Sequence, residues 1–330
     1  YELNAWIVKP VDFDESKKYP VLMFQYSGPN SQQVLDKYSF DWEQYLAANG
    51  IITVCVDGRG TGARGEAFRK CTYLRMGELE SKDQVEAAQA LGKLPFVDKS
   101  RMAIWGWSFG GYNTLMAMSV GNGTFKAGIA VAPPTDWKYY DSVYTERFMR
   151  TPKENFEGYA ATSPIRLAKD LQGKLLLIHG TADDNVHFQQ TMDYAESLVQ
   201  AGKQFEMQVY KDRNHSIYGG NTRYHLYTRK PDWLKIRLGG NEQFTRTKSI
   251  VESHCLHTIC TSGKCPNMGE CWSRGTATFM IAGDICTRSC RFCNTLTGKP
   301  LPLDPKEPAN VAESIRRQFM EQVESQLLIP

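Results

Sequence analysis

Gly106-Trp107-Ser108-Phe109-Gly110 (GWSFG) stands directly after an apolar run and directly before an amphipathic run in this 330-residue chain. A serine between two glycines at this spacing is typical of a strained turn that joins a strand to a helix. The glycines let neighbouring backbone approach the turn without a side-chain clash. Such a turn exposes the serine hydroxyl, and the helix N-terminus behind it favours a developing negative charge. The stretch therefore predicts a strand–turn–helix unit with Ser108 as a nucleophile.

Short apolar runs alternate with longer amphipathic runs on both sides of this turn. The apolar runs predict buried strands at residues 19–26, 51–56, 102–105, 127–132, 175–178 and 205–210. Helical spacing of apolar residues predicts helices at residues 83–94, 110–119 and 187–201. Because strands that alternate with helices usually form a parallel sheet covered on both faces, we expect an α/β fold with a mostly parallel sheet.

A nucleophilic serine needs a base, and the base needs a carboxylate that orients it. In this type of fold the order along the chain is serine, then aspartate, then histidine. Asp183 and His215 each follow one of the predicted strands. We therefore predict a catalytic triad of Ser108, Asp183 and His215, with Asp184 as the rival of Asp183. The other histidines of this part of the chain are expected to be structural: His179, His187 and His225.

Three motifs that contain these residues stand in order along the chain: GWSFGGY at residues 106–112, HGTADDNVH at residues 179–187, and Asn214-His215. Together they resemble the catalytic domain of the prolyl oligopeptidase family, and within it the dipeptidyl peptidase IV branch. The resemblance runs over residues 2–229. It implies an α/β-hydrolase fold and peptide substrates with proline near the N-terminus. Relatives also carry an N-terminal β-propeller that binds the free amino end of the substrate, and we expect it to be missing here.

The resemblance assigns roles to residues outside the triad as well. Tyr26 matches the tyrosine whose hydroxyl completes the oxyanion hole beside the backbone N–H of Phe109. Phe109 stands where relatives have tyrosine, and we expect a mild effect because the donor is main chain. The remaining matches line a pocket for proline or hold the substrate carbonyl: Trp137, Tyr140, Tyr144 and Val186 for the pocket, and Asn185 for the carbonyl.

An aromatic pocket of this kind makes physical sense, because flat rings contact a pyrrolidine ring and exclude larger side chains. The alternative for Tyr140 and Tyr144, four residues apart, is one helix face packed in the core. The same triad would also serve an acyl-peptide hydrolase or an esterase, which stays the alternative to cleavage after proline.

Seven of the nine cysteines fall between residues 255 and 293, so this part of the chain differs in kind from residues 1–229. Six of them form two triplets: Cys260, Cys265 and Cys271, then Cys286, Cys290 and Cys293. Three thiolates in a short loop can hold three irons of a 4Fe-4S cluster and leave the fourth iron open to a ligand. Zinc with His254 and His257 is the competing prediction, but structural zinc usually uses paired C-x2-C knuckles.

The motifs around the triplets are LHTIC at residues 256–260, CPNMGECW at residues 265–272, TATFM at residues 276–280 and GDICTRSCRFC at residues 283–293. They resemble lipoyl synthase, a radical S-adenosylmethionine enzyme. The resemblance implies an auxiliary 4Fe-4S cluster on the first triplet and a cluster that cleaves S-adenosylmethionine on the second. It also implies an octanoylated lipoyl carrier protein as partner. Residues 276–282 would form the first strand of a truncated radical SAM (β/α) barrel.

The sequence therefore predicts a peptidase domain at residues 1–229, a partial lipoyl synthase segment at residues 230–317, and an unassigned tail at residues 318–330. Lipoyl synthesis as the principal function stays open, as does a non-functional join of two neighbouring reading frames. The two parts of the chain predict different localisations. Cluster assembly points to the cytoplasm, whereas relatives of the peptidase half work in the periplasm or outside the cell.

Composition argues against two other classes of protein. A net charge of +3 without a clustered basic face gives no surface for nucleic acid. No apolar run approaches the ~18 residues of a membrane span.

Overall fold

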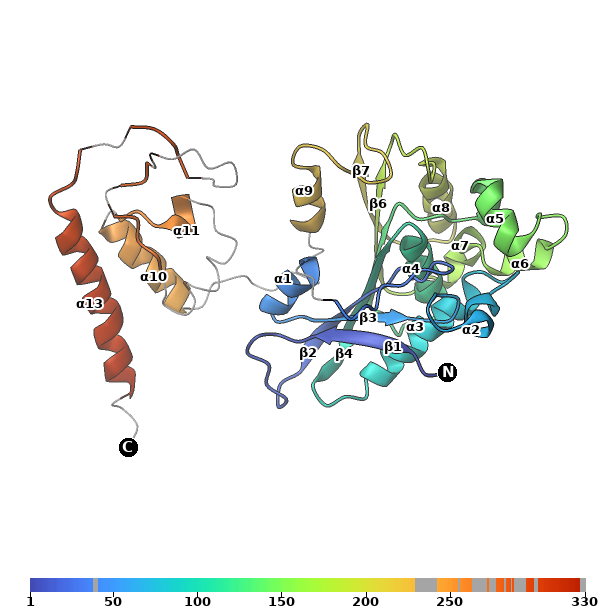
Figure 1. Cartoon of the computed structure of the whole chain (residues 1–330), viewed down its shortest axis with the longest axis horizontal. Coiled ribbons are helices and arrows are strands. Elements are labelled where there is room, and N and C mark those ends of the chain that lie inside the picture. The colour runs from blue at the N-terminus through green and yellow to red at the C-terminus, as the bar shows by residue number, and fades with distance from the viewer. Residues whose placement is uncertain are drawn as a thin grey trace. The chain divides into compact units, whose positions relative to one another are not determined.

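The computed structural model divides the chain into two units, Tyr1–Leu234 and Lys235–Pro330 (Figure 1). It describes residues 1–37, 41–228, 242–254, 256–262, 272, 277–281, 283–285, 287, 295–299 and 302–326. The border between the units falls within residues 229–241, which lie outside the described residues. The domain border expected at residue 229 therefore stays a prediction.

A seven-stranded sheet in the order β1-β3-β2-β4-β5-β6-β7 forms the frame of the first unit (Figure 1). Neighbouring strands run parallel, except that β1 runs antiparallel to β3 at one edge. The strands are β1 (Asn4–Val8), β2 (Tyr19–Phe24), β3 (Ile52–Asp57), β4 (Val97–Trp107), β5 (Ala127–Val131), β6 (Lys174–Gly180) and β7 (Glu206–Tyr210). All six predicted strands form, so the prediction of a mostly parallel sheet is confirmed.

The helices of this unit also include the three that the sequence predicts, at α3, α4 and α8. Over the described residues of the unit, the helices are α1 (Trp42–Ala48), α2 (Glu66–Lys70), α3 (Glu78–Leu91), α4 (Phe109–Val120), α5 (Ser142–Met149), α6 (Phe156–Ala161), α7 (Pro164–Leu167), α8 (Gln189–Gln200) and α9 (Thr222–Thr228). Two 3-10 turns accompany them, η1 (Trp137–Tyr139) and η2 (Ala168–Asp170).

Helices cover both faces of the sheet because successive strand residues point to opposite sides. Ile104 of β4 joins a large apolar core that also takes side chains from α3, α4 and α8. Its neighbour Trp105 points the other way, where its ring packs against Trp42 of α1 and Tyr227 of α9. The ring centroids are 4.9 and 6.5 Å apart, respectively. The expected coverage of both faces is therefore confirmed.

Two strand boundaries depend on pairing that the local sequence does not reveal. Strand β1 is not predicted by the sequence, because its residues are exposed or half-buried; it pairs with β3 at the edge of the sheet. Strand β4 begins at Val97, earlier than the predicted start at residue 102, because Val97 pairs with Tyr19 of β2. In both places the neighbouring strand, rather than an apolar run, fixes the extended backbone.

The second unit contains α10 (Glu242–Ser253), α11 (Ile259–Ser262) and α13 (Glu307–Gln326). A small apolar core joins Val251, Leu256, Cys260 and Trp272. Helix α13 runs on to residue 326, so much of the tail that the sequence analysis left unassigned is helical.

The strand predicted at residues 276–282 is not formed over residues 277–281, which are the part of it that the structure describes. Phe279 pairs with Thr258 in an isolated antiparallel bridge. A barrel strand needs a hydrogen-bonded neighbour on each side, and one bridge does not supply that. The described residues therefore give no support to a radical SAM barrel.

Among the described residues, no helix combines the length and the apolar character that crossing a membrane would require.

Candidate active site

The turn predicted at residues 106–110 links the end of β4 to the start of α4. Ser108 has φ of 58° and ψ of −119°, a conformation that costs energy for any residue with a side chain. A Cβ on Gly106 would lie 2.4 Å from the backbone carbon of Gly110, and a Cβ on Gly110 would lie 2.4 Å from the Gln25 carbonyl oxygen. Both positions therefore need glycine, and together they hold Ser108 at the carboxyl end of β4.

The structure joins the two predicted partners of Ser108 by a hydrogen bond. His215 Nδ1 lies 2.7 Å from Asp183 Oδ2. The Asp183 side chain is fully buried, whereas the His215 side chain is 21% exposed. Asp184, the rival for the role, is exposed on the surface. The geometry thus selects Asp183 as the carboxylate beside His215.

The Asp183 carboxylate is held by four hydrogen bonds. Its Oδ1 accepts from the backbone amides of Asn185 and Val186, at 3.0 and 2.9 Å. Its Oδ2 accepts from His215 and also from His179 Nε2 at 3.0 Å. Burial on its own would raise the pKa of Asp183, but the hydrogen bonds from His179 and His215 lower that pKa below its usual range. Asp183 is therefore ionised at neutral pH.

Trp107 ties the His215 loop to the turn that carries Ser108. Its indole Nε1 donates to the His215 carbonyl oxygen over 3.0 Å. Because Nδ1 of His215 faces Asp183, Nε2 is the ring nitrogen left to take a proton from Ser108. In the described part of the chain no hydrogen bond joins the Ser108 hydroxyl to His215. Such bonds are often long before substrate binds and tighten in the complex.

The predicted oxyanion-hole residues lie side by side beside the turn. The rings of Tyr26 and Phe109 have centroids 6.1 Å apart. Gln25 anchors the Tyr26 loop, because its Nε2 donates to the Gly110 carbonyl over 2.6 Å. Phe109 is the first residue of α4, and the first amides of a helix have no partner within it. Burial raises the pKa of the Tyr26 hydroxyl, so this group keeps its proton and can donate it.

Three predicted pocket residues form one aromatic cluster behind Phe109. Trp137 is 2% exposed, and its ring centroid lies 5.4 Å from Phe109, 6.0 Å from Tyr140 and 6.2 Å from Tyr144. The Tyr140 and Tyr144 rings meet edge to face, with centroids 5.3 Å apart. Tyr140 follows η1 and Tyr144 belongs to α5, so the alternative of a single helix face is wrong. Both tyrosines are half-buried, as residues of a pocket wall would be.

The last two predicted residues connect this cluster to Asp183. Tyr140 donates its hydroxyl proton to Asn185 Oδ1 over 2.7 Å. Val186 is fully buried, and its amide is bonded to Asp183. The aromatic cluster and the Asp183 loop therefore meet at Asn185.

His179, which the sequence predicts to be structural, also contacts the Asp183 carboxylate. The ring is fully buried, and it shares Asp183 Oδ2 with His215. The available signal was its position, at the end of a buried strand and four residues before Asp183.

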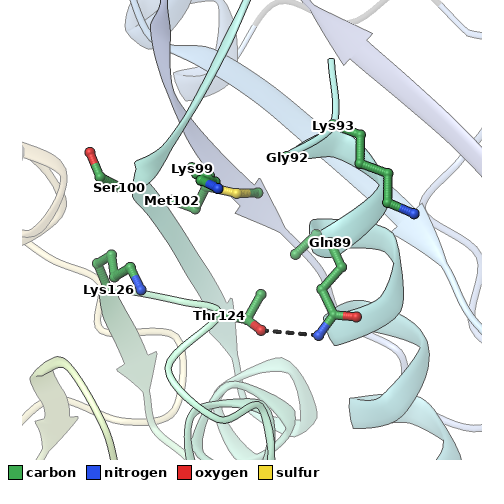
Figure 2. A pocket seen from close by; sticks show the side chains of 9 residues that line it. Gln89, Gly92, Lys93, Lys99, Ser100, Met102, Thr124 and Lys126 are labelled. Carbon is green, nitrogen blue, oxygen red and sulfur yellow. Dashed lines mark hydrogen bonds between the residues drawn. The ribbon is translucent and has the colours of Figure 1, made fainter. Parts of the chain in front are cut away.

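A cavity of about 450 Å³ lies elsewhere, at the amino ends of β4 and β5 (Figure 2). Ser108 stands at the other, carboxyl end of β4. Thr124 accepts from Gln89 over 3.3 Å and donates to the Gly121 carbonyl over 2.7 Å. Ser100 donates its hydroxyl proton to Asp98 over 2.6 Å. Because these hydroxyls already have partners and the chemistry lies at the other edge, the cavity is not the active site.

Only one of the six predicted cluster cysteines falls within the described residues. The Cys260 side chain is buried in the small apolar core of the second unit. The other five lie outside the described residues: Cys265, Cys271, Cys286, Cys290 and Cys293. In the described part of the chain, no three His, Cys, Asp or Glu side chains gather as a metal site would require.

Comparison with known proteins matches this chain to peptidases. The chain is 48% identical over 240 residues to a probable dipeptidyl-aminopeptidase B of Pyrenophora teres f. teres, covering 71% of this chain and 26% of the relative. It is 46% identical to dipeptidyl peptidase 4 of Felis catus, covering 71% of this chain and 31% of that protein. The chain thus spans less than a third of the length of these two relatives.

A solved structure agrees with these sequence matches. The crystal structure of Porphyromonas gingivalis dipeptidyl peptidase 4 superposes with a TM-score of 0.70 at 68% identity, over 71% of this chain and 33% of that one. A family model described as the prolyl oligopeptidase family matches residues 38–241. This match covers more than half of the chain, and it includes all three predicted triad residues. The chain therefore belongs to the prolyl oligopeptidase family.

Proposed function

We propose that the first unit is a serine peptidase that releases dipeptides ending in proline from the N-termini of peptides. The observation that carries the proposal is the 2.7 Å hydrogen bond between His215 and the buried Asp183, set beside the Ser108 turn. The dipeptidyl peptidases described above support the same class of reaction.

In the proposed reaction Ser108 Oγ attacks the carbonyl carbon of the scissile bond while its proton passes to His215 Nε2. The carbonyl π pair becomes an oxyanion that accepts from the Phe109 amide and the Tyr26 hydroxyl. As the oxyanion collapses, the C–N bond breaks, and His215 gives its proton to the leaving amine. Water then repeats the sequence on the acyl-enzyme with His215 as base. Asp183 stays ionised throughout and stabilises the protonated ring.

The aromatic cluster is the proposed source of the preference for proline. The Tyr140 ring lies edge-on to the buried Trp137 ring and the Tyr144 ring is tilted against it, and these surfaces suit a compact apolar ring. Val186 would form another wall, and Asn185 would hold the substrate carbonyl. This pocket favours the peptidase over a general esterase or acyl-peptide hydrolase.

The test uses the full chain with Gly-Pro-p-nitroanilide, Gly-Ala-p-nitroanilide and p-nitrophenyl acetate. We expect turnover of the proline amide well above that of the alanine amide, and a loss of kcat on the order of 10⁴-fold or more in Ser108→Ala. Retained turnover in Ser108→Ala would contradict the triad. Turnover of the acetate alone would contradict the preference for proline and favour the esterase alternative.

For residues 230–317 we propose that the six cysteines hold two 4Fe-4S clusters, with S-adenosylmethionine on the second, and that the partner is an octanoylated carrier protein. This proposal rests on the spacing of the cysteines and not on the relatives described above. Anaerobic reconstitution and iron analysis test it. About eight irons per chain are expected, and a reconstituted chain without iron would contradict it.

A further inference from the structure

His179 stands at the end of β6 with its ring fully buried, and the reaction proposed above gives it no task. Its Nε2 lies 3.0 Å from Asp183 Oδ2 and 2.8 Å from the Val186 carbonyl oxygen. Its Nδ1 lies 2.7 Å from the Thr191 hydroxyl of α8. The Phe188 ring meets it edge to face, with centroids 5.6 Å apart.

The partners of the ring determine which nitrogen carries a hydrogen. A carboxylate oxygen and a carbonyl oxygen can only accept, so Nε2 carries the hydrogen and shares it between Asp183 and Val186. The Thr191 hydroxyl can donate to Nδ1, so both ring nitrogens have a hydrogen-bond partner. A ring held at both nitrogens and packed against Phe188 has one orientation.

This orientation matters because Asp183 Oδ2 is the atom that His215 uses. Without His179, that oxygen would keep one donor, on a loop residue that is itself partly exposed. With His179, the oxygen is also fixed from the strand side of the sheet, by a residue of β6. The same N–H fixes the Val186 carbonyl, so one ring sets the position of the carboxylate and of the adjoining predicted pocket residue.

We infer that His179 is a positioning residue for the proposed reaction: its Nε2–H holds Asp183 Oδ2 in line with His215 and holds Val186 beside it. The inference rests on the proposed function, since it assigns His179 a part in that triad. Among the contacts that the structure gives for the His179 ring, Asp183 is the ionisable one.

Three variants separate the hydrogen bond from the bulk of the ring. His179→Gln keeps an N–H donor near the position of Nε2, and His179→Leu removes the donor while keeping an apolar side chain. Thr191→Val removes the hydroxyl on the other nitrogen with little change of shape. His225→Gln is the matched control, because His225 is bonded to the Tyr210 hydroxyl at 2.8 Å and not to Asp183.

The first readout is the rate constant for labelling Ser108 with a fluorophosphonate, normalised to folded protein, across pH. For His179→Leu we expect a loss of about 10- to 100-fold, the effect of one hydrogen bond to a charged group. We also expect the acid limb of its pH profile to move to higher pH. Without the hydrogen bond from His179, the Asp183 carboxylate attracts the proton on the His215 ring more strongly. His179→Gln should stay within about threefold of wild type, and Thr191→Val should fall between the two.

A merely structural His179 would behave differently. His179→Leu would then lower the folded fraction but label at the wild-type rate per folded chain, with an unmoved acid limb. That result, or a His179→Gln variant as slow as His179→Leu, would overturn the inference. A change in the His225→Gln control equal to that of His179→Leu would overturn it as well.

A second readout does not depend on activity. In full-length protein with ¹⁵N-labelled histidine, the His215 Nδ1–H proton should resonate far downfield, and it should shift in His179→Leu but not in His225→Gln. A wild-type chain that no fluorophosphonate labels would contradict the proposed function, and this resonance would still decide whether His179 positions Asp183. An unshifted resonance in His179→Leu would overturn the inference even if wild type is active.

Discussion

Asp183 and His215 form a pair in which a fully buried carboxylate accepts, over 2.7 Å, from a ring that is 21% exposed. The burial keeps water away from the carboxylate, and because Nδ1 faces Asp183, Nε2 is the ring nitrogen left for Ser108. The pair lies at the carboxyl ends of β6 and β7, and the Ser108 turn lies at the end of β4 in the same sheet. The parallel sheet therefore delivers all three residues to one edge.

Replacing Asp183 with Asn tests this pair most simply. The amide presents an N–H where His215 and His179 both need an acceptor, so the His215 ring is expected to lose its working tautomer. We expect kcat for Gly-Pro-p-nitroanilide to fall on the order of 10⁴-fold. Asp184→Asn is the matched control at the exposed neighbouring carboxylate, and it should stay near wild type. A strong loss in Asp184→Asn with little loss in Asp183→Asn would reverse the assignment.

Substitution of Tyr26 tests whether its hydroxyl donates to the oxyanion. Tyr26→Phe keeps the ring that packs beside Phe109 and removes the hydroxyl donor. We expect kcat to fall about 10²- to 10³-fold, because a donor to the oxyanion acts mainly in the transition state, with little change in KM. Tyr73→Phe, at a 46% exposed tyrosine, is the control. A large rise in KM at constant kcat would instead show that Tyr26 binds the ground state.

Substitution of Tyr144 tests whether the aromatic pocket selects proline. Tyr144→Ala removes a ring that contacts both Tyr140 and Phe148, with centroids at 5.3 and 5.0 Å. We expect kcat/KM to fall about 10-fold or more for Gly-Pro-p-nitroanilide and much less for the Gly-Ala amide, so the ratio between them drops. Phe156→Ala, at a 63% exposed ring, should leave the ratio unchanged. Equal losses on both amides would mean that Tyr144 does not select proline.

The raised pKa of Glu80 predicts how the stability of the folded chain depends on pH. Burial raises the pKa of this carboxyl from 4.5 to about 8. Between those pH values the folded chain holds a proton that the unfolded chain has lost, so stability falls as pH rises through this window and levels off above it. Glu80→Gln cannot ionise, so its urea midpoint should fall less between about pH 5 and about pH 8. The exposed Glu86→Gln is the control, and identical pH slopes in all three proteins would contradict the assignment.

Much of the first unit could be predicted because its signals are local. Apolar runs mark the buried strands, and the glycines around Ser108 are fixed by backbone approaches of 2.4 Å. Asp183 and His215 follow strand ends, where a parallel sheet gathers functional residues. The pairing of these two residues follows from the order of the strands along the chain.

Other features depend on contacts between distant parts of the chain. Strand β1 forms because it pairs with β3. Strand β4 starts early because its first residues pair with β2. Tyr140 and Tyr144 suggest one helix by their spacing, yet a helix begins between them at Ser142. His179 and His215 share Asp183 Oδ2, and the sequence hints at the His179 contact only through its place at a strand end.

We expect Ser108 to be the nucleophile that the His215–Asp183 pair activates. The most direct measurement is to treat the full chain with a fluorophosphonate and map the adduct by mass spectrometry of the tryptic peptide at residues 102–126. We expect one adduct per chain on Ser108, formed in step with loss of Gly-Pro-p-nitroanilide turnover and absent in Ser108→Ala. Peptide turnover that survives complete labelling, or an adduct confined to another residue, would contradict the claim.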